Sequence, residues 1–337
     1  MRMNQFVPKL VEAGAAVRIA PFFDDAYLHA LFGRGARPGR SAVAGHARRL
    51  RTLIGPGADL VWLEKELFPF LPGVAERALQ WRGLAYVVDY DDAVFHRYDR
   101  HPSRLVRRVF GDKLRPLIAG AAAVTAGNEY LADYARTRGA RRVEIVPTVV
   151  DPAAYPVTAP PAGPSLRIGW IGTPANARYL ATVADALRLL GDAVPATLVT
   201  IGAPALPDLP VPQEAHPWSE DTEGALLASC DVGVMPLRDS SYERGKCGYK
   251  LIQCMAAARP VIASPVGANR GIVTPDVGIL AETAPQWADA IQRLADDPGL
   301  RARMGAAGRA RVEAHYSKAV AGRAIVALFA GLLGPRA

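Results

Sequence analysis

The sequence predicts an α/β protein made of two doubly wound domains that face each other across a cleft. Its 337 residues exceed what one hydrophobic core usually organises, so two domains of about 150 residues each are expected. Hydrophobic residues make up 50% of the chain and charged residues 21%, as in ordinary soluble globular proteins. Segments that are apolar throughout alternate with amphipathic ones, which indicates parallel sheets covered by helices on both faces.

The first 150 residues form one alternating unit. A helical stripe of apolar side chains between Met3 and Val11 opens the chain, and an apolar stretch at 16–20 predicts the first strand. Further strands are expected at 59–63, 84–88, 122–125 and 143–146. Helices are expected between them, at 41–53, 73–81, 102–118 and 128–138. This alternation assigns 1–150 to an N-terminal doubly wound domain.

A proline-rich segment separates this unit from a second one. Five prolines between Pro152 and Pro164 predict a linker at 151–164, because such segments favour an extended chain. In the C-terminal domain, 165–316, strands are expected at 166–171, 196–201, 231–235, 261–263 and 277–280. Parallel sheets bind ligands at the carboxyl ends of their strands, so we expect the functional site in the cleft between the domains.

Charge is unevenly distributed along the chain. Through Val150 there are 23 Lys and Arg against 15 Asp and Glu, whereas from Asp151 onward the counts are 17 and 17. Basic residues gather at 97–115, interleaved with apolar residues such as Leu105 and Val109. This pattern predicts an amphipathic basic helix of the kind that lies on anionic lipid, although a solvated helix face has the same pattern. No nucleic-acid motif accompanies it.

The cysteines and the apolar runs indicate the cellular compartment of the protein. Cys230, Cys247 and Cys254 have neither the close pairing of zinc sites nor the spacing of a disulfide framework, which favours a reducing cytosol. The longest apolar runs, at 118–124 and 324–333, are too short or too rich in Ala and Gly to cross a bilayer. We therefore expect a cytoplasmic protein, with peripheral attachment to the inner face of the membrane as an option.

The most informative stretch is 236–267, PLRDSSYERGKCGYKLIQCMAAARPVIASPVG. It is expected to leave an apolar strand, cross a polar loop, enter a helix near Gly245 and return to a strand at Pro260. Four polar side chains at helical spacing would share one face of that helix. They are Lys246, Tyr249, Lys250 and Gln253.

The positive end of this helix carries basic residues. Arg244, Lys246 and Lys250 would be disfavoured there by a few tenths to about 1 kcal/mol each. An anion should neutralise them, and a diphosphate is the natural candidate because free N–H groups and cations would converge on it. Alternatively, these side chains point to solvent or pair with Asp239 and Glu243.

Two other segments end strands at the expected cleft. LRIGWIGTPAN at 166–176 runs through Gly172 into a helix with Thr173 as a candidate N-cap; glycine lets backbone approach a phosphate, but an ordinary strand-to-helix turn has the same pattern. YVVDYDDAVF at 86–95 places Asp89, Asp91 and Asp92 after a strand. These carboxylates could position or deprotonate a hydroxyl, bind a divalent cation or cap the next helix.

The stretch ERGKCGYKLIQCMAAARPVIASPVG resembles the signature region of GT-B glycosyltransferases in the large retaining group-one class. In that class, a helix with two glutamates eight positions apart precedes a G-x-P-V-V-A-S strand and loop. The segments VVDYDDAVF, VTAGNEYLADYA, VEIVPTVVD and LRIGWIG and the closing 304–317 region are also similar to members of the class. The resemblance implies two Rossmann-like domains of GT-B type. It also implies a nucleotide-sugar donor on the C-terminal domain, an acceptor on the N-terminal domain, no required metal, and a last helix at 317–337 that packs back on the N-terminal domain.

The sequence departs from that pattern at both glutamates. Aligned on 260–264, the second glutamate corresponds to Gln253 and the first to Gly245, with Glu243 two positions away. Gln253 can still exchange hydrogen bonds with ribose hydroxyls, but without charge. The first glutamate, which the resemblance assigns to the donor sugar, has no direct counterpart. Similar sequences with a G-K-x-x-Y-K-L-I-Q run share this variation, which we interpret as a subgroup trait.

These observations predict a retaining, hexosyltransferase-type glycosyltransferase that moves a sugar from a nucleoside diphosphate to a lipid-linked or polysaccharide acceptor of the cell envelope. The expected catalytic residues are Asp89, Asp91 and Asp92, with no metal site and no cofactor. The expected donor-binding residues are Gly172, Thr173, Glu243, Arg244, Lys246, Tyr249, Lys250, Gln253 and Gly267. The alternatives are a sugar-nucleotide epimerase on the same fold and a non-catalytic nucleotide-binding scaffold.

The N-terminus carries one further expectation. Members of the resembled class begin with a hydrophobic strand and a Gly-rich loop, whereas here only Met1 and Arg2 precede the first helix. We therefore expect the N-terminal sheet to lack its usual first strand, which is central, and to leave backbone groups of two neighbouring strands unpaired. On this expectation, the chain starts at an internal methionine of a longer reading frame, which would lower its stability or activity.

Overall fold

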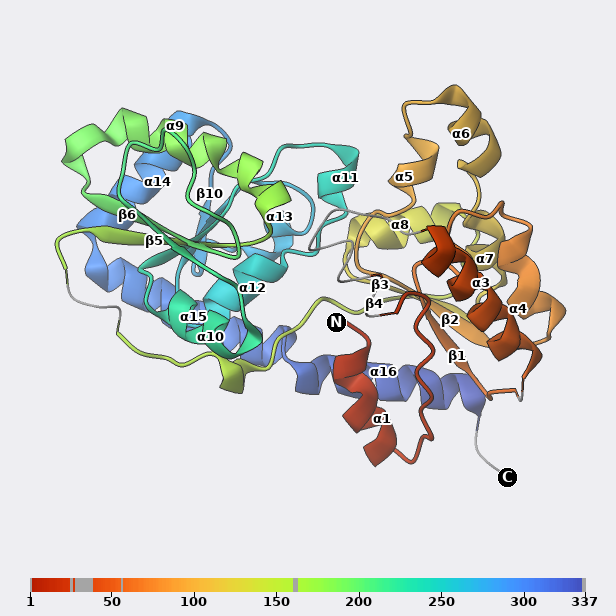
Figure 1. The fold of residues 1–337 in the computed structure, drawn as a ribbon. Helices are drawn as coiled ribbons and strands as arrows, with labels where there is room; N and C mark the ends of the chain where they lie inside the picture. The colour runs from red at the N-terminus through yellow and green to blue at the C-terminus, as the bar shows by residue number, and fades with distance from the viewer. Residues whose placement is uncertain (1, 25–26, 28–38, 56, 160–162, 335–337) are drawn as a thin grey trace.

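Two parallel sheets, each flanked by helices, form two lobes that lie side by side (Figure 1). The computed structural model describes residues 2–24, 27, 39–55, 57–159 and 163–334. One sheet is built from strands before Val150 and the other from strands that begin at Leu166. This arrangement confirms the predicted α/β class with two doubly wound domains.

The N-terminal sheet has the strand order β1-β2-β3-β4, and each neighbouring pair is parallel. Its central strands are completely buried, because apolar side chains alternate to both faces and helices cover each of them. The strands are β1 (Val61–Glu64), β2 (Tyr86–Tyr90), β3 (Ala123–Ala126) and β4 (Val143–Ile145). The helices are η1 (Asn4–Phe6), α1 (Val7–Glu12), α3 (Gly39–Ile54), η2 (Ala75–Arg77), α4 (Ala78–Trp81), α5 (His96–Asp99), α6 (Arg104–Phe110), α7 (Arg115–Gly120) and α8 (Glu129–Thr137).

Two predictions about this sheet are wrong. Residues 16–20 form no strand, and Val17 and Ile19 are 39% and 58% exposed. The four described strands follow one another without a gap, so no central vacancy leaves two neighbours unpaired. Within the described residues, β1 is an edge strand that pairs only with β2.

The continuous basic helix predicted at 102–118 is also wrong. The segment forms α6 and α7 with a turn between them, because Lys113 points into the domain rather than to solvent. Its ammonium lies 2.7 Å from the Glu76 carboxylate and 2.9 Å from that of Glu66. Burying this ion pair requires the chain to turn inward between the two short helices.

The C-terminal sheet has the order β10-β9-β8-β5-β6-β7, again with every pair parallel. Its strands are β5 (Leu166–Ile171), β6 (Ala196–Ile201), β7 (Gln213–His216), β8 (Val232–Met235), β9 (Val261–Ala263) and β10 (Gly278–Leu280). The sequence analysis missed β7 because its residues are polar, as an edge strand allows. The helices are η4 (Pro174–Leu180), α9 (Ala181–Leu190), η5 (Gly191–Ala193), α10 (Glu220–Ala228), α11 (Ser241–Arg244), α12 (Tyr249–Ala256), α13 (Asn269–Ile272), α14 (Ala284–Asp296) and α15 (Pro298–His315).

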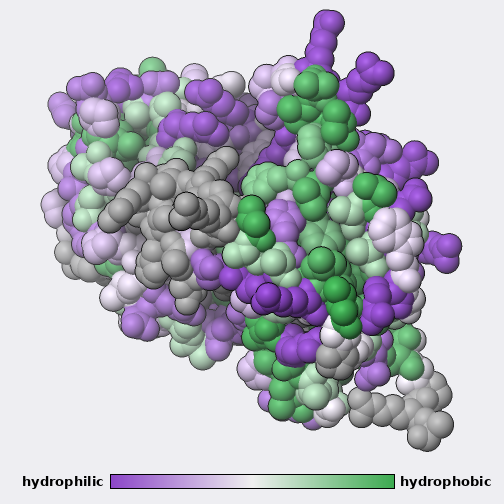
Figure 2. Space-filling view, turned by 45° about the vertical axis from the view of Figure 1, so that its right-hand side comes forward, coloured by the Kyte–Doolittle hydropathy of each residue, from purple (hydrophilic) through white to green (hydrophobic). Residues whose placement is uncertain are grey.

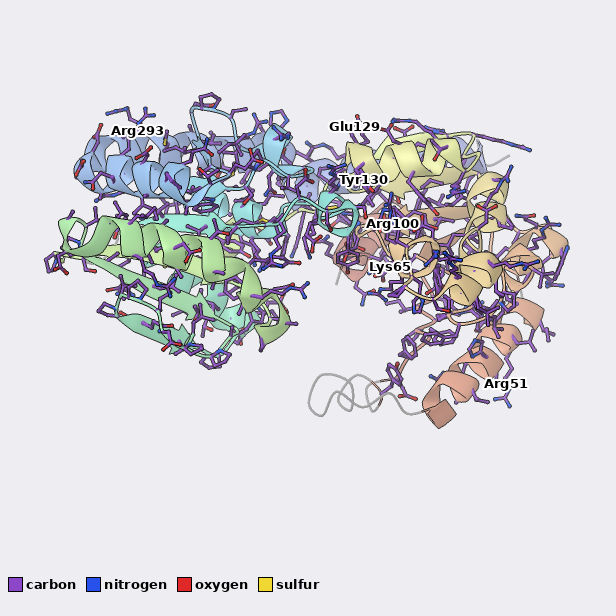
Figure 3. All side chains as sticks on the ribbon, turned by 90° about the horizontal axis from the view of Figure 1, so that it is seen from above. Arg51, Lys65, Arg100, Glu129, Tyr130 and Arg293 are labelled. Carbon is purple, nitrogen blue, oxygen red and sulfur yellow. The ribbon has the colours of Figure 1, made fainter. Side chains whose placement is uncertain are left out.

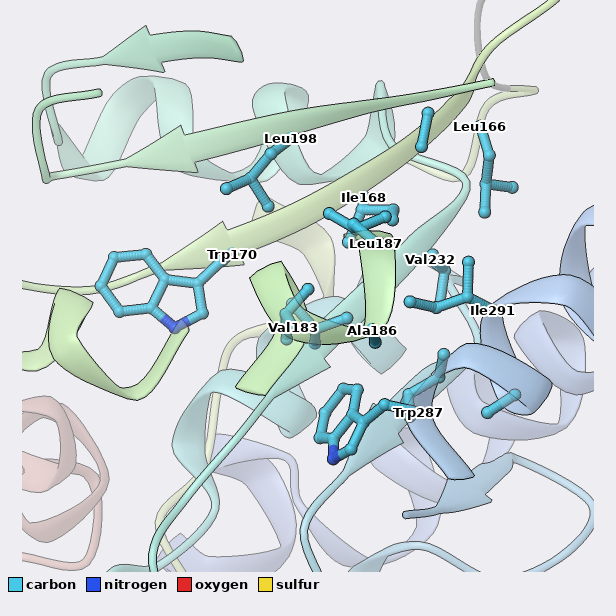
Figure 4. Close-up of a cluster of buried hydrophobic side chains, with 14 of the residues drawn as sticks. Leu166, Ile168, Trp170, Val183, Ala186, Leu187, Leu198, Val232, Trp287 and Ile291 are labelled. Carbon is cyan, nitrogen blue, oxygen red and sulfur yellow. The ribbon is translucent and has the colours of Figure 1, made fainter. Parts of the chain in front are cut away.

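A large apolar core lies between this sheet and helices α9 and α14 (Figure 4). Trp170 and Trp287, both almost completely buried, are its largest side chains. Burial of a large side chain contributes about 1.5–3 kcal/mol. The core therefore fixes β5, the strand that carries Trp170 toward the cleft.

Two chain crossings join the domains. The linker holds η3 (Pro152–Ala154), and the last helix, α16 (Lys318–Leu333), begins after the second crossing. Val150 and Ser317 form a parallel bridge, so the crossings run side by side. Helix α16 then packs against α1 and η1, and Ile325 joins Phe6 and Val146 in a shared apolar cluster.

Candidate functional site

The strand order of the C-terminal sheet reverses at β5, which lies between β8 and β6. Such a switch point leaves a crevice at the carboxyl ends of the strands, where doubly wound folds bind ligands. A small cavity of ≈ 20 Å³ lies there. Side chains that line it include Trp170, Tyr179, Leu237, Lys246 and Lys250.

Lys250 is the most unusual cation of this crevice. Its ammonium lies over the Trp170 ring, 4.0 Å from the centroid, and forms no ion pair with any described carboxylate. Burial, together with the nearby charge of Lys246, lowers the pKa of Lys250 to about 7. Partial burial of a cation without an anion has a free-energy cost, so this half-buried ammonium is suited to a bound anion.

Lys246 lies beside Lys250 but not on the same helix. Helix α12 begins at Tyr249, after Gly248 in the left-handed conformation, so the predicted helix start near Gly245 is wrong. The Lys246 ammonium lies 5.4 Å from the centroid of the Tyr242 ring. Both ammonium groups nevertheless line the same cavity, as the prediction of a shared anion site requires.

The neighbouring charged residues are already engaged. Arg244 forms a bidentate ion pair with Asp239, at 2.6 and 2.9 Å, and is half exposed. Glu243 is buried and accepts hydrogen bonds from the hydroxyls of Tyr179 and Ser240. The pair of Arg244 with Asp239 is the alternative that the sequence left open, whereas Glu243 is bound by hydroxyl groups rather than by a Lys or Arg.

The glycines of the predicted site lie where side chains would collide with the protein. A Cβ atom at Gly172 would lie 2.2 Å from the Lys250 Nζ, so glycine at the end of β5 leaves room for that ammonium. Gly267 has a φ of +54° and a backbone that abuts the Arg244 carbonyl, which favours glycine there. Thr173 stands before η4 without a capping bond from its side chain. Tyr249 is 41% exposed.

Gln253 lies on α12 one turn after Lys250 and is almost fully buried. Its amide nitrogen donates to the Glu223 carboxylate at 2.9 Å and to the Tyr155 hydroxyl at 3.2 Å. These contacts fix the orientation of the Gln253 amide, which is not itself among the side chains that line the cavity.

The three candidate aspartates have different surroundings. Asp89 is completely buried. It forms an ion pair with Arg2, at 2.8 Å, and accepts a hydrogen bond from Thr125 at 2.6 Å. This carboxylate is fully engaged inside the domain, so the structure does not bring it to the cleft surface as expected.

Asp91 and Asp92 lie closer to the cleft. Asp92 accepts hydrogen bonds from the Tyr242 hydroxyl at 3.0 Å and from the Ala93 backbone. The Lys65 ammonium is 3.1 Å from Oδ1 of Asp91, in an ion pair, yet that buried oxygen accepts no hydrogen bond. Lys65 has a left-handed φ of 67°, a conformation that is costly for a residue with a side chain and that often occurs at functional sites.

The loop between α11 and α12 forms much of the contact between the domains. Asn128, the N-cap of α8, donates to the carbonyls of Gly245 and Lys246 at 3.1 Å each. Cys247 packs within the N-terminal core, and its thiol donates to the Asp91 carbonyl. A Cβ at Gly245 would lie 2.4 Å from that of Ala93. A glutamate side chain therefore has no space at this position, which explains the departure from the two-glutamate pattern.

Several residues of the crevice were missed by the sequence analysis. Trp170 and Tyr179 line the cavity, but an apolar strand and a helix face are their ordinary positions. Asn128 has a recognisable signal, an N-cap residue before an amphipathic helix, yet its second contact across the cleft has none. Figure 3 shows Lys65, Arg100 and Tyr130 on the side of the N-terminal domain nearest to the C-terminal domain.

No group of three or more His, Cys, Asp and Glu side chains in the described part of the chain is arranged to hold a metal ion. Among the same residues, no helix has both the length and the apolar character needed to span a membrane.

Residues 166–297 match a family model described as "Glycosyl transferases group 1". The chain is 36% identical over 100 residues to the GDP-mannose-dependent monoacylated alpha-(1-6)-phosphatidylinositol monomannoside mannosyltransferase of Corynebacterium glutamicum, covering 28% of this chain and 26% of that one. It is 34% identical over 101 residues to the alpha-D-kanosaminyltransferase of Streptomyces kanamyceticus, covering 29% and 26%. These matches span about a quarter of the length of the curated relatives.

Solved glycosyltransferase structures resemble nearly the whole chain. Sucrose-phosphate synthase from Thermosynechococcus elongatus has a TM-score of 0.67 at 16% identity, over 87% of this chain and 78% of that one. HepE from Anabaena, in complex with UDP, also has a TM-score of 0.67, at 15% identity, over 92% and 90%. Residues 166–297 therefore form a domain of the glycosyl transferases group 1 family, within a chain that has the GT-B fold.

Proposed function

We propose that the chain is a retaining glycosyltransferase of hexosyltransferase type, which moves a sugar from a nucleoside diphosphate to a lipid-linked or polysaccharide acceptor. The observation that carries this proposal is Lys250 at the switch point of the sheet, a partly buried ammonium that lies over the Trp170 ring and has no anionic partner among the described residues. A donor diphosphate would supply that anion. The family match at 166–297 supports the same conclusion.

The donor side of the proposed site runs along α12. Lys250 and Lys246 stabilise the diphosphate as it leaves, and charge stabilisation of this kind is usually the largest contribution to such transfers. The free N–H groups at the start of α12 add to it. Thr173 contributes a hydroxyl donor, and Gln253 binds ribose. The Gly172 N–H already donates to the Ile201 carbonyl at 2.9 Å, so the role of Gly172 is to leave room for the Lys250 ammonium. Arg244, Glu243, Tyr249 and Gly267 shape the surrounding wall.

The nucleotide follows from the chemistry of the relatives rather than from this chain alone. HepE was solved with UDP, and the corynebacterial relative is named as GDP-mannose-dependent. Both names concern those proteins. They support a nucleoside diphosphate as the donor class here, and they leave UDP and GDP as the two forms to test.

The acceptor side of the proposed site lies on the N-terminal domain. Asp91 orients the acceptor hydroxyl. Its buried Oδ1 lies 3.1 Å from the Lys65 ammonium but accepts no hydrogen bond from the described residues, so a substrate hydroxyl that reaches this oxygen would supply one. Asp92 supports the domain contact through Tyr242. Asp89, paired with Arg2, holds the end of β2 in place and does not touch the acceptor.

Admission of the donor requires the two domains to separate. The cavity of ≈ 20 Å³, lined by side chains of the C-terminal domain, holds less than one nucleoside. Hydrogen bonds between the domains include those of Asn128, the bond between Tyr242 and Asp92, and the bond from the Cys247 thiol to the Asp91 carbonyl. Net contributions of about 0.5–1.5 kcal/mol for each hydrogen bond allow such an opening.

An anionic membrane surface is the proposed source of the acceptor. Helix α6 buries none of its residues, and Leu105 and Val109 are 70% and 46% exposed beside Arg104 and Arg108. Figure 2 shows hydrophobic side chains next to long hydrophilic ones where the molecule projects at the top of the view. Apolar side chains flanked by arginines suit a layer of anionic headgroups.

The experiment that tests the proposal measures release of nucleoside diphosphate from a panel of sugar donors, with and without acceptor lipid extracts. A glycosyltransferase releases the diphosphate faster when the acceptor is present and forms a glycosylated lipid. An epimerase would convert the donor without an acceptor. A scaffold would bind nucleotide without turnover, and either outcome would contradict the proposal.

A further inference from the structure

One buried carboxylate connects three separate segments of the chain where α10 packs against α12. Glu223 on α10 is 7% exposed. Its Oε1 accepts hydrogen bonds from the Tyr155 hydroxyl at 2.5 Å and from the Gln253 amide at 2.9 Å. Its Oε2 accepts from the Trp218 indole at 2.6 Å. The carboxylate is thus held by Tyr155 of the linker, Gln253 of α12 and Trp218 of the segment after β7.

These contacts force one orientation on the Gln253 amide. An amide side chain has a donating nitrogen and an accepting oxygen of nearly the same shape, and either could face a neighbour. The carboxylate of Glu223 accepts only, so a rotated amide would place two acceptor oxygens in contact. Both hydrogens of the Gln253 nitrogen are used, one by Glu223 and one by Tyr155.

The Gln253 side chain therefore offers a ligand only a hydrogen-bond acceptor, its Oε1. Among the described residues, no hydrogen bond reaches this Oε1. Gln253 lies three positions after Lys250, on the same side of α12, but it is 2% exposed and is not among the side chains that line the small cavity. On the proposed function, the nucleotide extends from the diphosphate along this side of the helix to the Gln253 oxygen. A carboxylate at position 253 would be an acceptor by nature. The Gln253 amide acts as an acceptor toward a ligand because its nitrogen already donates to Glu223.

We propose that Glu223 is a positioning residue for the donor, which fixes the Gln253 amide so that its oxygen accepts a hydroxyl of the nucleotide ribose. This inference rests on the proposed function, since it assumes a nucleoside diphosphate along α12. Glu223 itself does not touch the ligand. Trp218 stabilises the arrangement, because its indole N–H prevents the carboxylate from rotating away.

The first experiment is calorimetric binding of UDP and GDP, and of their 2′-deoxy and 3′-deoxy forms, to the full chain. Wild-type protein should lose about 3- to 10-fold in affinity when the hydroxyl bound by Gln253 is absent, as expected for one neutral hydrogen bond. Glu223→Gln lets the amide rotate, so this variant should bind the parent nucleotide and the deoxy form almost equally. Glu220→Gln is the matched control, because it makes the same charge change on an exposed position of α10 and should keep the wild-type discrimination.

A second set of variants keeps the test decisive if Glu223→Gln folds poorly. Gln253→Glu places a second carboxylate against Glu223, so it should lower the melting temperature and weaken nucleotide binding. The double variant exchanges the amide and the carboxylate between the two positions. The carboxylate at position 253 then accepts the ribose hydroxyl, and the amide at position 223 donates to that carboxylate. The double variant should therefore recover the discrimination between parent and deoxy nucleotide.

The possible failures can be told apart. Retained hydroxyl discrimination in Glu223→Gln, or a double variant no better than Gln253→Glu, would overturn the role of Glu223 and leave the proposed function intact. Wild-type protein that binds neither UDP nor GDP would overturn both.

Discussion

Replacement of Lys250 by Met tests the diphosphate site without relying on turnover. Methionine keeps much of the side-chain length and its contact with the Trp170 ring but removes the charge. A hydrogen bond to a charged group contributes about 1.5–3 kcal/mol. The variant should therefore bind nucleoside diphosphate about 10- to 150-fold more weakly, whereas Lys9→Met, which breaks only a surface ion pair, should bind as the wild type does.

Proton uptake on nucleotide binding is a second measurable consequence of the contact between Lys250 and the diphosphate. The free protein holds Lys250 with its pKa lowered to about 7, mainly by burial. A bound diphosphate favours the charged ammonium, so binding raises that pKa and takes up a proton. At pH 8, only about one tenth of the free lysine is protonated, so about 0.9 proton should be taken up for each nucleotide bound. Affinity should then fall as pH rises above 7, and this lysine should have no effect on the pH dependence well below 7.

Calorimetry in two buffers with different ionisation enthalpies measures this uptake directly. The ligand's own phosphate groups also titrate, so the comparison of wild type with Lys250→Met isolates the lysine. The reasoning would be refuted by a variant that binds with unchanged affinity and takes up as many protons as the wild type.

As pH rises above 7, nucleotide affinity should fall, whereas the contribution of Lys250 to the stability of the nucleotide-free protein should rise. An unfolded chain keeps the lysine protonated up to about pH 10.5, whereas the folded chain releases that proton near pH 7. The unfolded state therefore binds more protons between these values, and the contribution of this group to stability rises with pH across that window. Lys250→Met should raise the melting temperature of the nucleotide-free protein at pH 7, with a smaller gain at pH 10; a lower melting temperature at pH 7 would argue against an uncompensated buried charge.

Four further outcomes are expected. Gly245→Glu should lower stability by about 1–3 kcal/mol because a side chain there meets Ala93, and an unchanged denaturation midpoint would contradict the close packing. Asp91→Asn should lower kcat at least tenfold with little effect on the donor KM, and a change confined to the donor KM would remove Asp91 from the acceptor site. Turnover should survive EDTA, since cations replace a metal in the proposed site; loss of activity that manganese restores would count against this. Leu105→Asp should weaken cosedimentation with anionic liposomes, and high salt should do so too, whereas equal binding to neutral and anionic vesicles would exclude electrostatic attachment.

The sequence was most informative where local patterns and burial agree. The strand at Leu166–Ile171 was predicted with correct bounds, because six residues between a proline-rich linker and a glycine are apolar enough for a central buried strand. The crevice cations Lys246 and Lys250 were found from their spacing and charge. Both contribute to the observed cavity, although the helix that was expected to hold them begins only at Tyr249.

Long-range partners could not be predicted in the same way. Nothing near Asp89 in the sequence indicates that Arg2, 87 positions away, neutralises it. Likewise, the apolar stretch at 16–20 has the composition of a strand but lacks a neighbour to pair with, and strand formation depends on that neighbour. Contacts between distant segments decided these cases, and local propensity does not contain them.

The path of the last helix changes how this chain can be divided. Although Ser317 follows the C-terminal domain in sequence, α16 fills an apolar surface of the other domain, where Leu328 contacts a cluster that includes Val87 and Ala123. A fragment that ends at the linker lacks α16 and would expose that apolar surface to solvent. The N-terminal unit is therefore discontinuous, and recombination with related chains must exchange residues 1–150 together with 317–334. A crossover placed only at the linker would pair a helix from one parent with a sheet from the other.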